Sequence, residues 1–93
     1  MEIFKKMADN FDEERLTLKV VEELSELSEV LVKRLTRKEG QKPSVEKIIE
    51  EIGDVFFRSH CLIAKLGIHE KVEDRIRQKS IQVEKWYFEN QNL

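Results

Sequence analysis

The chain has 93 residues, of which 39% are charged and 40% are hydrophobic, and its formal net charge is −2. That length suits one small domain, and the near balance of acids and bases shows neither the basic face of a nucleic-acid-binding protein nor the acidic tail of a disordered one. One proline and three glycines are too few for the turns of a sandwich or barrel, so we expect an all-α fold in a single domain spanning residues 1–93.

The N-terminal part of the chain predicts one long helix. The segment before Phe11 is too charged for a signal peptide and is a candidate for a short helix. The first strong helical period runs over about residues 11–37, with apolar residues at Val20, Leu24, Leu27, Leu31 and Leu35. Basic residues crowd its end and Gly40 follows, and both are usual signals for the end of a helix.

A second helix is predicted over about residues 45–66. Ser44 is a good N-cap residue, and Gly67 is suited to a left-handed cap. The C-terminal half of this helix is apolar nearly all round, and such a helix must be covered on every side. Two other helices of a small chain do not cover it easily, so we expect a second subunit, in a homodimer or homotetramer. The residues expected in that interface include Phe56, Phe57 and Ile63.

The single cysteine, Cys61, lies in this apolar helix. A lone cysteine excludes an internal disulfide, and apolar neighbours indicate a buried thiol in a reducing compartment. The longest unbroken apolar run is only "CLIA", whereas a membrane span needs about 20 apolar residues. We therefore expect a cytoplasmic protein that neither crosses a membrane nor binds nucleic acid.

A third helix is predicted over about residues 69–90, where one face carries Val72, Ile76, Val83 and Tyr87. The fold expected from the whole pattern is a helical bundle of three main helices per chain, completed by oligomerisation.

Four acidic residues have matching positions on the first two helices. At about 100° per residue, Glu23 and Glu26 lie roughly 70° and 130° to one side of the first apolar stripe. Glu51 and Asp54 have the same relation to the stripe of the second helix. Two helices packed through those stripes would bring four carboxylates to one flank of their seam.

Carboxylates gathered in this way repel one another and need a compensating cation. Their oxygens suit Mg²⁺, or Mn²⁺ as the alternative, better than zinc, which prefers histidine and cysteine ligands. Gly53 between the acids has no side chain, so a neighbouring helix or a ligand could approach the backbone there. Single pairs of acids on a helix are usually solvated surface, but two pairs in register beside a glycine favour a metal site.

The segments "EELSEL" and "EEIGDV", at this separation and followed by an apolar run, resemble the signature of MazG-type all-α nucleoside triphosphate pyrophosphohydrolases. The resemblance covers roughly residues 16–87. It implies a helical bundle built by dimers or tetramers and a Mg²⁺-dependent cleavage between the α and β phosphates, which gives a monophosphate and pyrophosphate. By match to the motif, it also implies that the metal ligands are Glu23, Glu26, Glu51 and Asp54.

The third helix departs from the family pattern, which commonly carries a lysine and an asparagine that help to hold the nucleotide. Val83 stands where the asparagine is expected. Lys79 lies about 60° from the stripe of its helix, so its ammonium either reaches a phosphate or extends along the surface into water. Arg75 and Lys85 are weaker candidates for substrate binding.

The leading hypothesis is a Mg²⁺-dependent enzyme that converts nucleoside triphosphates, ribo or deoxyribo, to monophosphates and pyrophosphate. Glu26 is our choice for the residue that orients or deprotonates the attacking water, although the sequence does not separate it from Glu23. One alternative is a phosphoribosyl-ATP pyrophosphohydrolase-like enzyme, which has similar acidic motifs. Another is a non-catalytic helical interaction protein whose acids are merely solvated.

Overall fold

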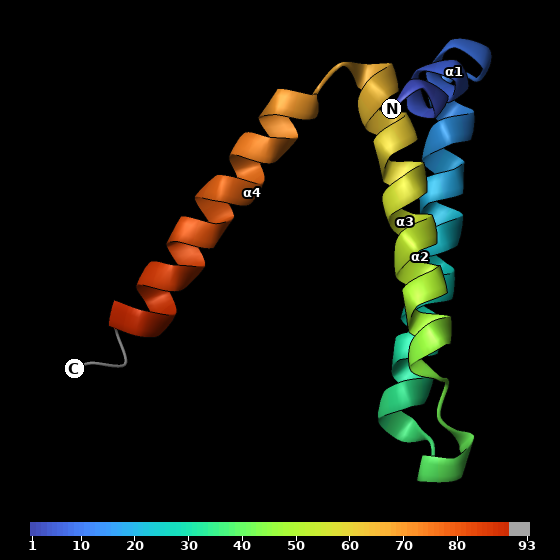
Figure 1. Cartoon of the computed structure of the whole chain (residues 1–93), viewed down its shortest axis with the longest axis vertical. Coiled ribbons are helices and arrows are strands. Elements are labelled where there is room, and N and C mark those ends of the chain that lie inside the picture. Colours follow the sequence, from blue (N-terminus) through green and yellow to red (C-terminus); the bar gives the residue numbers. More distant parts are fainter. Residues whose placement is uncertain (90–93) are drawn as a thin grey trace.

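The computed structural model describes residues 1–89, and no strand occurs among them, so the predicted all-α class is confirmed. Four α-helices follow one another, joined or followed by two short helical segments (Figure 1). Their bounds are α1 (Glu2–Asn10), α2 (Glu13–Thr36), the 3₁₀ turn η1 (Glu39–Gln41), α3 (Val45–Leu66), α4 (His69–Glu84) and the π-helical segment η2 (Lys85–Glu89).

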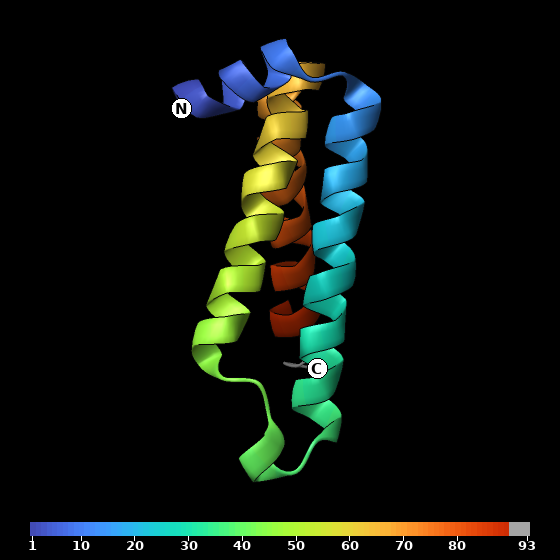
Figure 2. The same ribbon diagram turned by 90° about the vertical axis from the view of Figure 1, so that its right-hand side faces the viewer.

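Helices α2 and α3 form an antiparallel hairpin that is the main packed unit of the chain (Figures 1 and 2). The turn η1 lies at one end of this hairpin, between the two helices in sequence. Helix α1 lies across the other end and packs against α3 (Figure 2). The short N-terminal segment is thus a helix with a structural role, because it covers one end of the hairpin.

Local capping interactions fix the ends of the hairpin helices. The Asp12 carboxylate accepts a hydrogen bond from the backbone N–H of Arg15 at 2.8 Å and caps α2. Ser44 caps α3 by accepting from the backbone N–H of Lys47 at 3.1 Å. Gly67 ends α3 with a φ of 64°, a left-handed conformation that favours glycine. The predicted caps at Ser44 and Gly67 are therefore confirmed.

The core of the described chain is small and follows the seam of α2 and α3 up to the end that α1 covers. Phe4 of α1 packs on α3, with its ring centroid 5.6 Å from that of Phe57 and 5.1 Å from that of His60. The Lys65 ammonium donates a hydrogen bond to the Ala8 carbonyl at 2.9 Å and so ties α3 to the end of α1. The buried apolar residues of the described chain are Ala8, Leu16, Val30, Val55 and Cys61.

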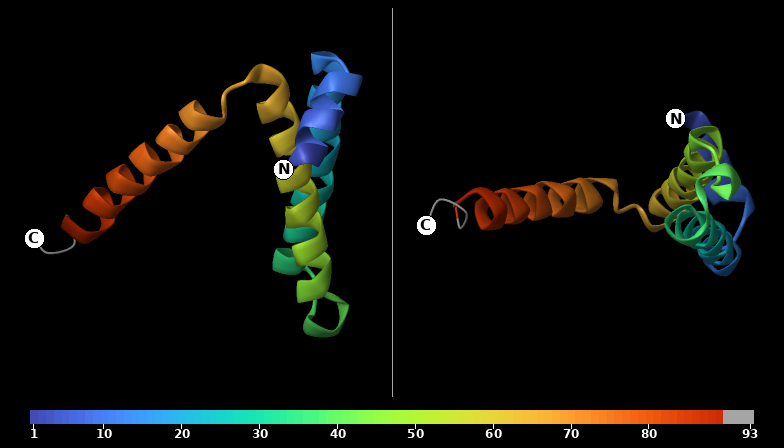
Figure 3. Two further views of the ribbon diagram at one scale, coloured as in Figure 1. Left: turned by 45° about the horizontal axis from the view of Figure 1, so that its top comes forward. Right: turned by 90° about the horizontal axis from the view of Figure 1, so that it is seen from below.

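Helix α4 leaves the hairpin after Gly67 and projects away from it (Figures 1 and 3). No residue of α4 is buried, and apolar side chains such as Ile76, 60% exposed, face open space. The α-helical pattern ends at Glu84 and continues as η2, while the predicted end of this helix at Asn90 lies outside the described residues. A three-helix bundle therefore does not form within one chain.

Apolar exposure extends to the hairpin itself. Phe56 on α3 is 62% exposed, whereas its neighbour Phe57 is half-buried beneath α1. A second subunit that covers Phe56 stays a prediction. None of the helices between residues 1 and 89 is both long enough and apolar enough to cross a membrane.

Candidate metal centre

Three of the four predicted acids meet at the seam of the hairpin. Glu23 comes from α2, and Glu51 and Asp54 come from successive turns of α3. One carboxylate oxygen from each of the three lies within 4.8 Å of the others. Glu23 thus lies beside the ExxD pair, as the helical arithmetic predicted. The packed face of α2 is nevertheless rotated from the predicted stripe, because Leu24, Leu31 and Leu35 are exposed whereas Leu16 and Val30 are buried.

This acidic cluster, defined as Glu23, Glu51 and Asp54, reaches from the interior to the surface. Glu51 is only 5% exposed, Glu23 is half-buried and Asp54 is exposed. The Oε2 atoms of Glu23 and Glu51 are buried without a hydrogen-bond partner in the described residues. Unpartnered buried carboxylate oxygens are costly, so the cluster has unused capacity to bind a positive ligand.

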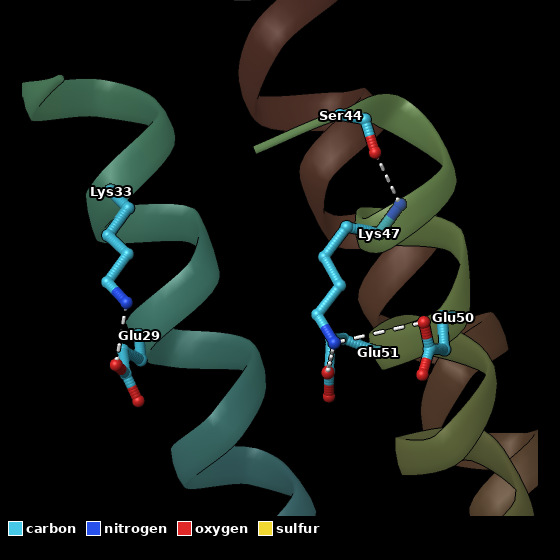
Figure 4. Close-up of polar contacts among 6 residues, drawn as sticks. All are labelled: Glu29, Lys33, Ser44, Lys47, Glu50 and Glu51. Atoms are coloured by element: carbon cyan, nitrogen blue, oxygen red, sulfur yellow. Dashed lines mark hydrogen bonds and ion pairs between the residues drawn. The ribbon is translucent and has the colours of Figure 1, made fainter. Parts of the chain in front are cut away.

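The environment of Glu23 favours its neutral form. Burial raises the pKa of the Glu23 carboxyl, and the negative charges of Glu26 and Asp54 raise it further, as do a side-chain hydrogen bond with Glu26 and the charge of Glu22. Glu29, on the same helix, shows the opposite behaviour. Its pKa is lowered by a hydrogen bond and ion pair with Lys33, whose Nζ lies 2.9 Å from Oε1 (Figure 4). A solvated acid of α2 therefore has a basic partner, whereas Glu23 faces other acids.

Lys47 is the one cation in direct contact with the acidic cluster among the described residues. Its ammonium lies 3.0 Å from Oε1 of Glu51 and 3.8 Å from Oε2 of Glu50 (Figure 4). The hydrogen bond to Glu51 is the main cause that raises the pKa of Lys47, followed by the charges of Glu50 and Glu51. Lys47 is not among the predicted site residues, although its position four residues before Glu51 places the two on one helix face.

Glu26, the fourth predicted acid, lies at the edge of the acidic cluster. It is exposed and is not part of the three-residue group, but its carboxyl is close enough to hydrogen-bond to Glu23 and to act on its pKa. Glu26 also contributes to the electrostatic environment of Lys47 across the seam. The structure therefore brings all four acids to one flank of the hairpin, with three close together and one beside them.

The basic residues predicted on α4 do not meet these acids within one chain. Arg75, Lys79 and Lys85 are all exposed on the projecting segment α4–η2. Lys79 borders a separate surface cavity of about 340 Å³, formed with Gln82, Val83, Trp86 and Tyr87. Their role in substrate binding stays a prediction.

Gly53 was expected to allow a close approach to the backbone, but no neighbouring helix of this chain makes one. Apart from its sequence neighbours and the backbone of its own helix, no heavy atom of residues 1–89 lies within 4 Å of the position that a Cβ would take at Gly53. The prediction that another helix of the same chain approaches the backbone at Gly53 is wrong, because α2 packs against a different face of α3. Approach by a ligand or by a second subunit stays a prediction.

The donor set of the acidic cluster consists of carboxylate oxygens alone. Oxygen donors suit a hard divalent cation such as Mg²⁺ or Mn²⁺, and the buried, unpartnered oxygens of Glu23 and Glu51 point to the same class of ligand. The residues present therefore fit a divalent metal ion.

The model of the MazG nucleotide pyrophosphohydrolase domain matches residues 11–88. The chain belongs to this family. The match spans α2, α3, α4 and most of η2, and it supports an enzyme of the nucleotide pyrophosphohydrolase type. Curated proteins and solved structures gave no match. Helix α1, which covers the end of the hairpin, lies before the matched residues.

Proposed function

We propose that the protein is a Mg²⁺-dependent nucleoside triphosphate pyrophosphohydrolase, with Mn²⁺ as a possible substitute metal. The observation that carries the proposal is the acidic cluster of a MazG domain, in which two buried carboxylate oxygens lack a partner. The overall reaction takes one nucleoside triphosphate and one water to a nucleoside monophosphate and pyrophosphate.

Glu23, Glu51 and Asp54 would hold the metal ion at the seam of α2 and α3. When bound, the cation supplies charge neutralisation for the phosphate oxygens of the substrate. Rigid helices present all three carboxylates, so the site requires little reorganisation when its ligand arrives.

Glu26 is the proposed acceptor for the proton of the attacking water. It is exposed beside the acidic cluster, whereas Glu23 has an oxygen buried within it. A carboxylate engaged with a metal is a poorer base than a free one, which favours Glu26 over Glu23. The water oxygen forms a bond to the α-phosphorus, and the bond from that phosphorus to the α–β bridging oxygen breaks. Pyrophosphate leaves with the electron pair of the broken bond, and Glu26 takes the water proton.

The proposed assembly is a homodimer or homotetramer in which a second copy covers the exposed apolar faces of α3 and α4. Such an arrangement would allow the α4 cations of one copy to approach the acidic cluster of another. Lys79 and, less strongly, Arg75 and Lys85 are the proposed phosphate contacts in that assembly.

The test is a pyrophosphate-release assay with ribo- and deoxyribonucleoside triphosphates in the presence of Mg²⁺ or Mn²⁺. Glu51→Gln should abolish release, whereas Glu46→Gln, an exposed acid in the first turn of the same helix, should leave it nearly unchanged. Turnover of phosphoribosyl-ATP alone would contradict the proposed substrate. Absence of turnover and of any Mg²⁺-dependent thermal shift would favour a non-catalytic interaction protein.

A further inference from the structure

A second polar feature lies on the hairpin, at the end that α1 covers. A surface cavity of about 230 Å³, here called the basic pocket, is bordered by residues from α1, α2 and α3 and by Phe11, which joins α1 to α2. Three of them are cationic and three are apolar: Arg15, Lys19, Arg58, Met7, Phe11 and Leu16. Leu16 is 2% exposed, so the floor of the basic pocket is part of the core.

The basic pocket is one helical turn from the acidic cluster. Arg58 follows Asp54 by four residues on α3, and Lys19 precedes Glu23 by four residues on α2. Residues four apart share a helix face and are separated by about 6 Å along the axis. Because α2 and α3 are antiparallel, both steps lead in the same direction, toward α1.

The two arginines are held by aromatic rings rather than by acids. The Arg58 guanidinium lies 5.5 Å from the centroid of Phe57, and that of Arg15 lies 5.4 Å from the centroid of Phe11. Neither guanidinium is within 4 Å of a carboxylate oxygen of the described residues. Arg58 therefore does not neutralise Asp54, although the two are neighbours on one helix face.

We propose that the basic pocket binds the distal phosphates of the substrate, so that the leaving pyrophosphate lies toward α1 and the nucleoside lies toward η1. This proposal rests on the proposed function. Two guanidinium groups and one ammonium at the pocket match a group with several negative charges, and guanidinium binds phosphate oxygens in a bidentate manner. Lys19 already has an acidic partner, because its Nζ lies 3.3 Å from Oε2 of Glu22, but a neutral base would leave both arginines without a counter-charge.

The proposal predicts a specific pattern of inhibition. Pyrophosphate carries the distal phosphates but no nucleoside, whereas the nucleoside monophosphate carries the nucleoside but neither distal phosphate. Arg58→Met should therefore raise the inhibition constant of pyrophosphate and the KM of the triphosphate by about tenfold or more, and leave that of the monophosphate unchanged. Arg15→Met, at a more exposed position, should show the same pattern with a smaller change.

Arg37→Met is the matched control, because Arg37 is an exposed arginine at the opposite end of α2 from the basic pocket. It should leave all three constants unchanged. Circular dichroism and thermal unfolding identify any variant that has lost its fold, and Arg15→Met gives the test if Arg58→Met is one of them.

If Arg58→Met instead weakened inhibition by the monophosphate and left inhibition by pyrophosphate unchanged, the substrate would lie in the opposite orientation and the proposal would be overturned. Equal, small changes for both inhibitors would make the arginines structural and would overturn it too. If the wild-type protein hydrolyses no triphosphate, calorimetric titration with pyrophosphate and Mg²⁺ still tests the basic pocket separately from the proposed reaction. Binding that Arg58→Met weakens would support the basic pocket while the proposed reaction fails, and no binding at all would overturn both.

Discussion

The α2–α3 hairpin and helix α4 have similar apolar patterns but very different surroundings. The hairpin has side-chain caps at the starts of both helices, buried residues along its seam and a third helix across its end. Helix α4 has no side-chain cap, no buried residue and exposed apolar side chains that include Ile81 and Trp86. An apolar stripe alone thus does not tell where a helix packs. No described residue after Gly67 is fully buried, so most of the apolar stripe of α4 remains exposed in the single chain.

The largest effect is expected where the hairpin gathers its acids. Asp54→Asn should lower kcat/KM by about 10³-fold or more, since it removes one of three carboxylates proposed to bind the metal. The same change relieves repulsion within the acidic cluster, so the variant should unfold at a higher temperature than the wild type when no metal is added. Mg²⁺ should raise the melting temperature of the wild type and have little effect on the variant.

Steady-state pyrophosphate release and thermal unfolding, each with and without Mg²⁺, measure both parts of this prediction. An Asp54→Asn variant that hydrolyses triphosphates at the wild-type rate would remove the acidic cluster from the mechanism.

The next largest effect is expected on assembly, because a second copy that covers α4 would remove the difference in burial between the hairpin and α4. We expect a homodimer at least, because a single chain leaves Phe56 on α3 and Ile76 on α4 exposed. Phe56→Asp should weaken association by about a hundredfold while leaving the helix content unchanged, since Phe56 is already exposed in the single chain. Ser28→Asp, an exposed polar position of α2, is the control.

Sedimentation at micromolar concentration measures the mass of each variant against the 11.1 kDa of one chain. A wild-type protein that stays monomeric under these conditions would show that α4 needs no partner, and the burial argument would then be wrong.

The distinction between Lys79 and Lys85 tests whether α4 takes part in catalysis. Lys79→Met should lower kcat/KM by about 10²-fold if its ammonium stabilises charge on the phosphates in the assembled protein. Lys85→Met should change it little, because Lys85 lies farther than Lys79 from the apolar stripe of its helix and a solvated lysine contributes weakly to binding or folding. Both variants are assayed by pyrophosphate release, with their folding checked by circular dichroism.

Equal and small losses in the two variants would make Lys79 a surface residue and confine catalysis to the hairpin. A large loss for Lys85→Met alone would mean that a different face of α4–η2 meets the substrate.

The parts of the structure that sequence could predict are those decided locally. Ser44 lies directly before α3 and Gly67 directly after it, so the bounds of α3 follow from these two capping residues. The position of Glu51 relative to Asp54 depends only on helical geometry. Which face of α2 packs was predicted less well, because Leu24 and Leu31 of the predicted stripe are exposed.

The remaining features depend on the path of the chain between elements. The direction of α4 is set by the short connection after Gly67, and the sequence of that connection does not predict the angle between α3 and α4. Lys47 was missed because lysine beside glutamate is common on any helix, and only burial of Glu51 makes this pair distinctive. The basic pocket needs Met7 and Phe11, which reach α3 only because α1 folds back across the hairpin.

The smallest effect is expected at Gly53, and it tests whether a ligand or a second copy contacts the exposed face of α3 at that residue. Glycine inside a helix costs about 1 kcal/mol relative to alanine, and a Cβ at this position would contact no other helix of the described residues. Gly53→Ala should therefore stabilise the single chain by about 1 kcal/mol in urea unfolding. If a ligand or a second copy approaches the backbone at this point, the same methyl group should also lower activity or association.

Ala64→Gly, at an exposed position later in α3, is the reciprocal control and should destabilise by a similar amount. A gain in stability with full activity and unchanged association would leave Gly53 without a functional role, and the acids on either side of it would then form the site without its help.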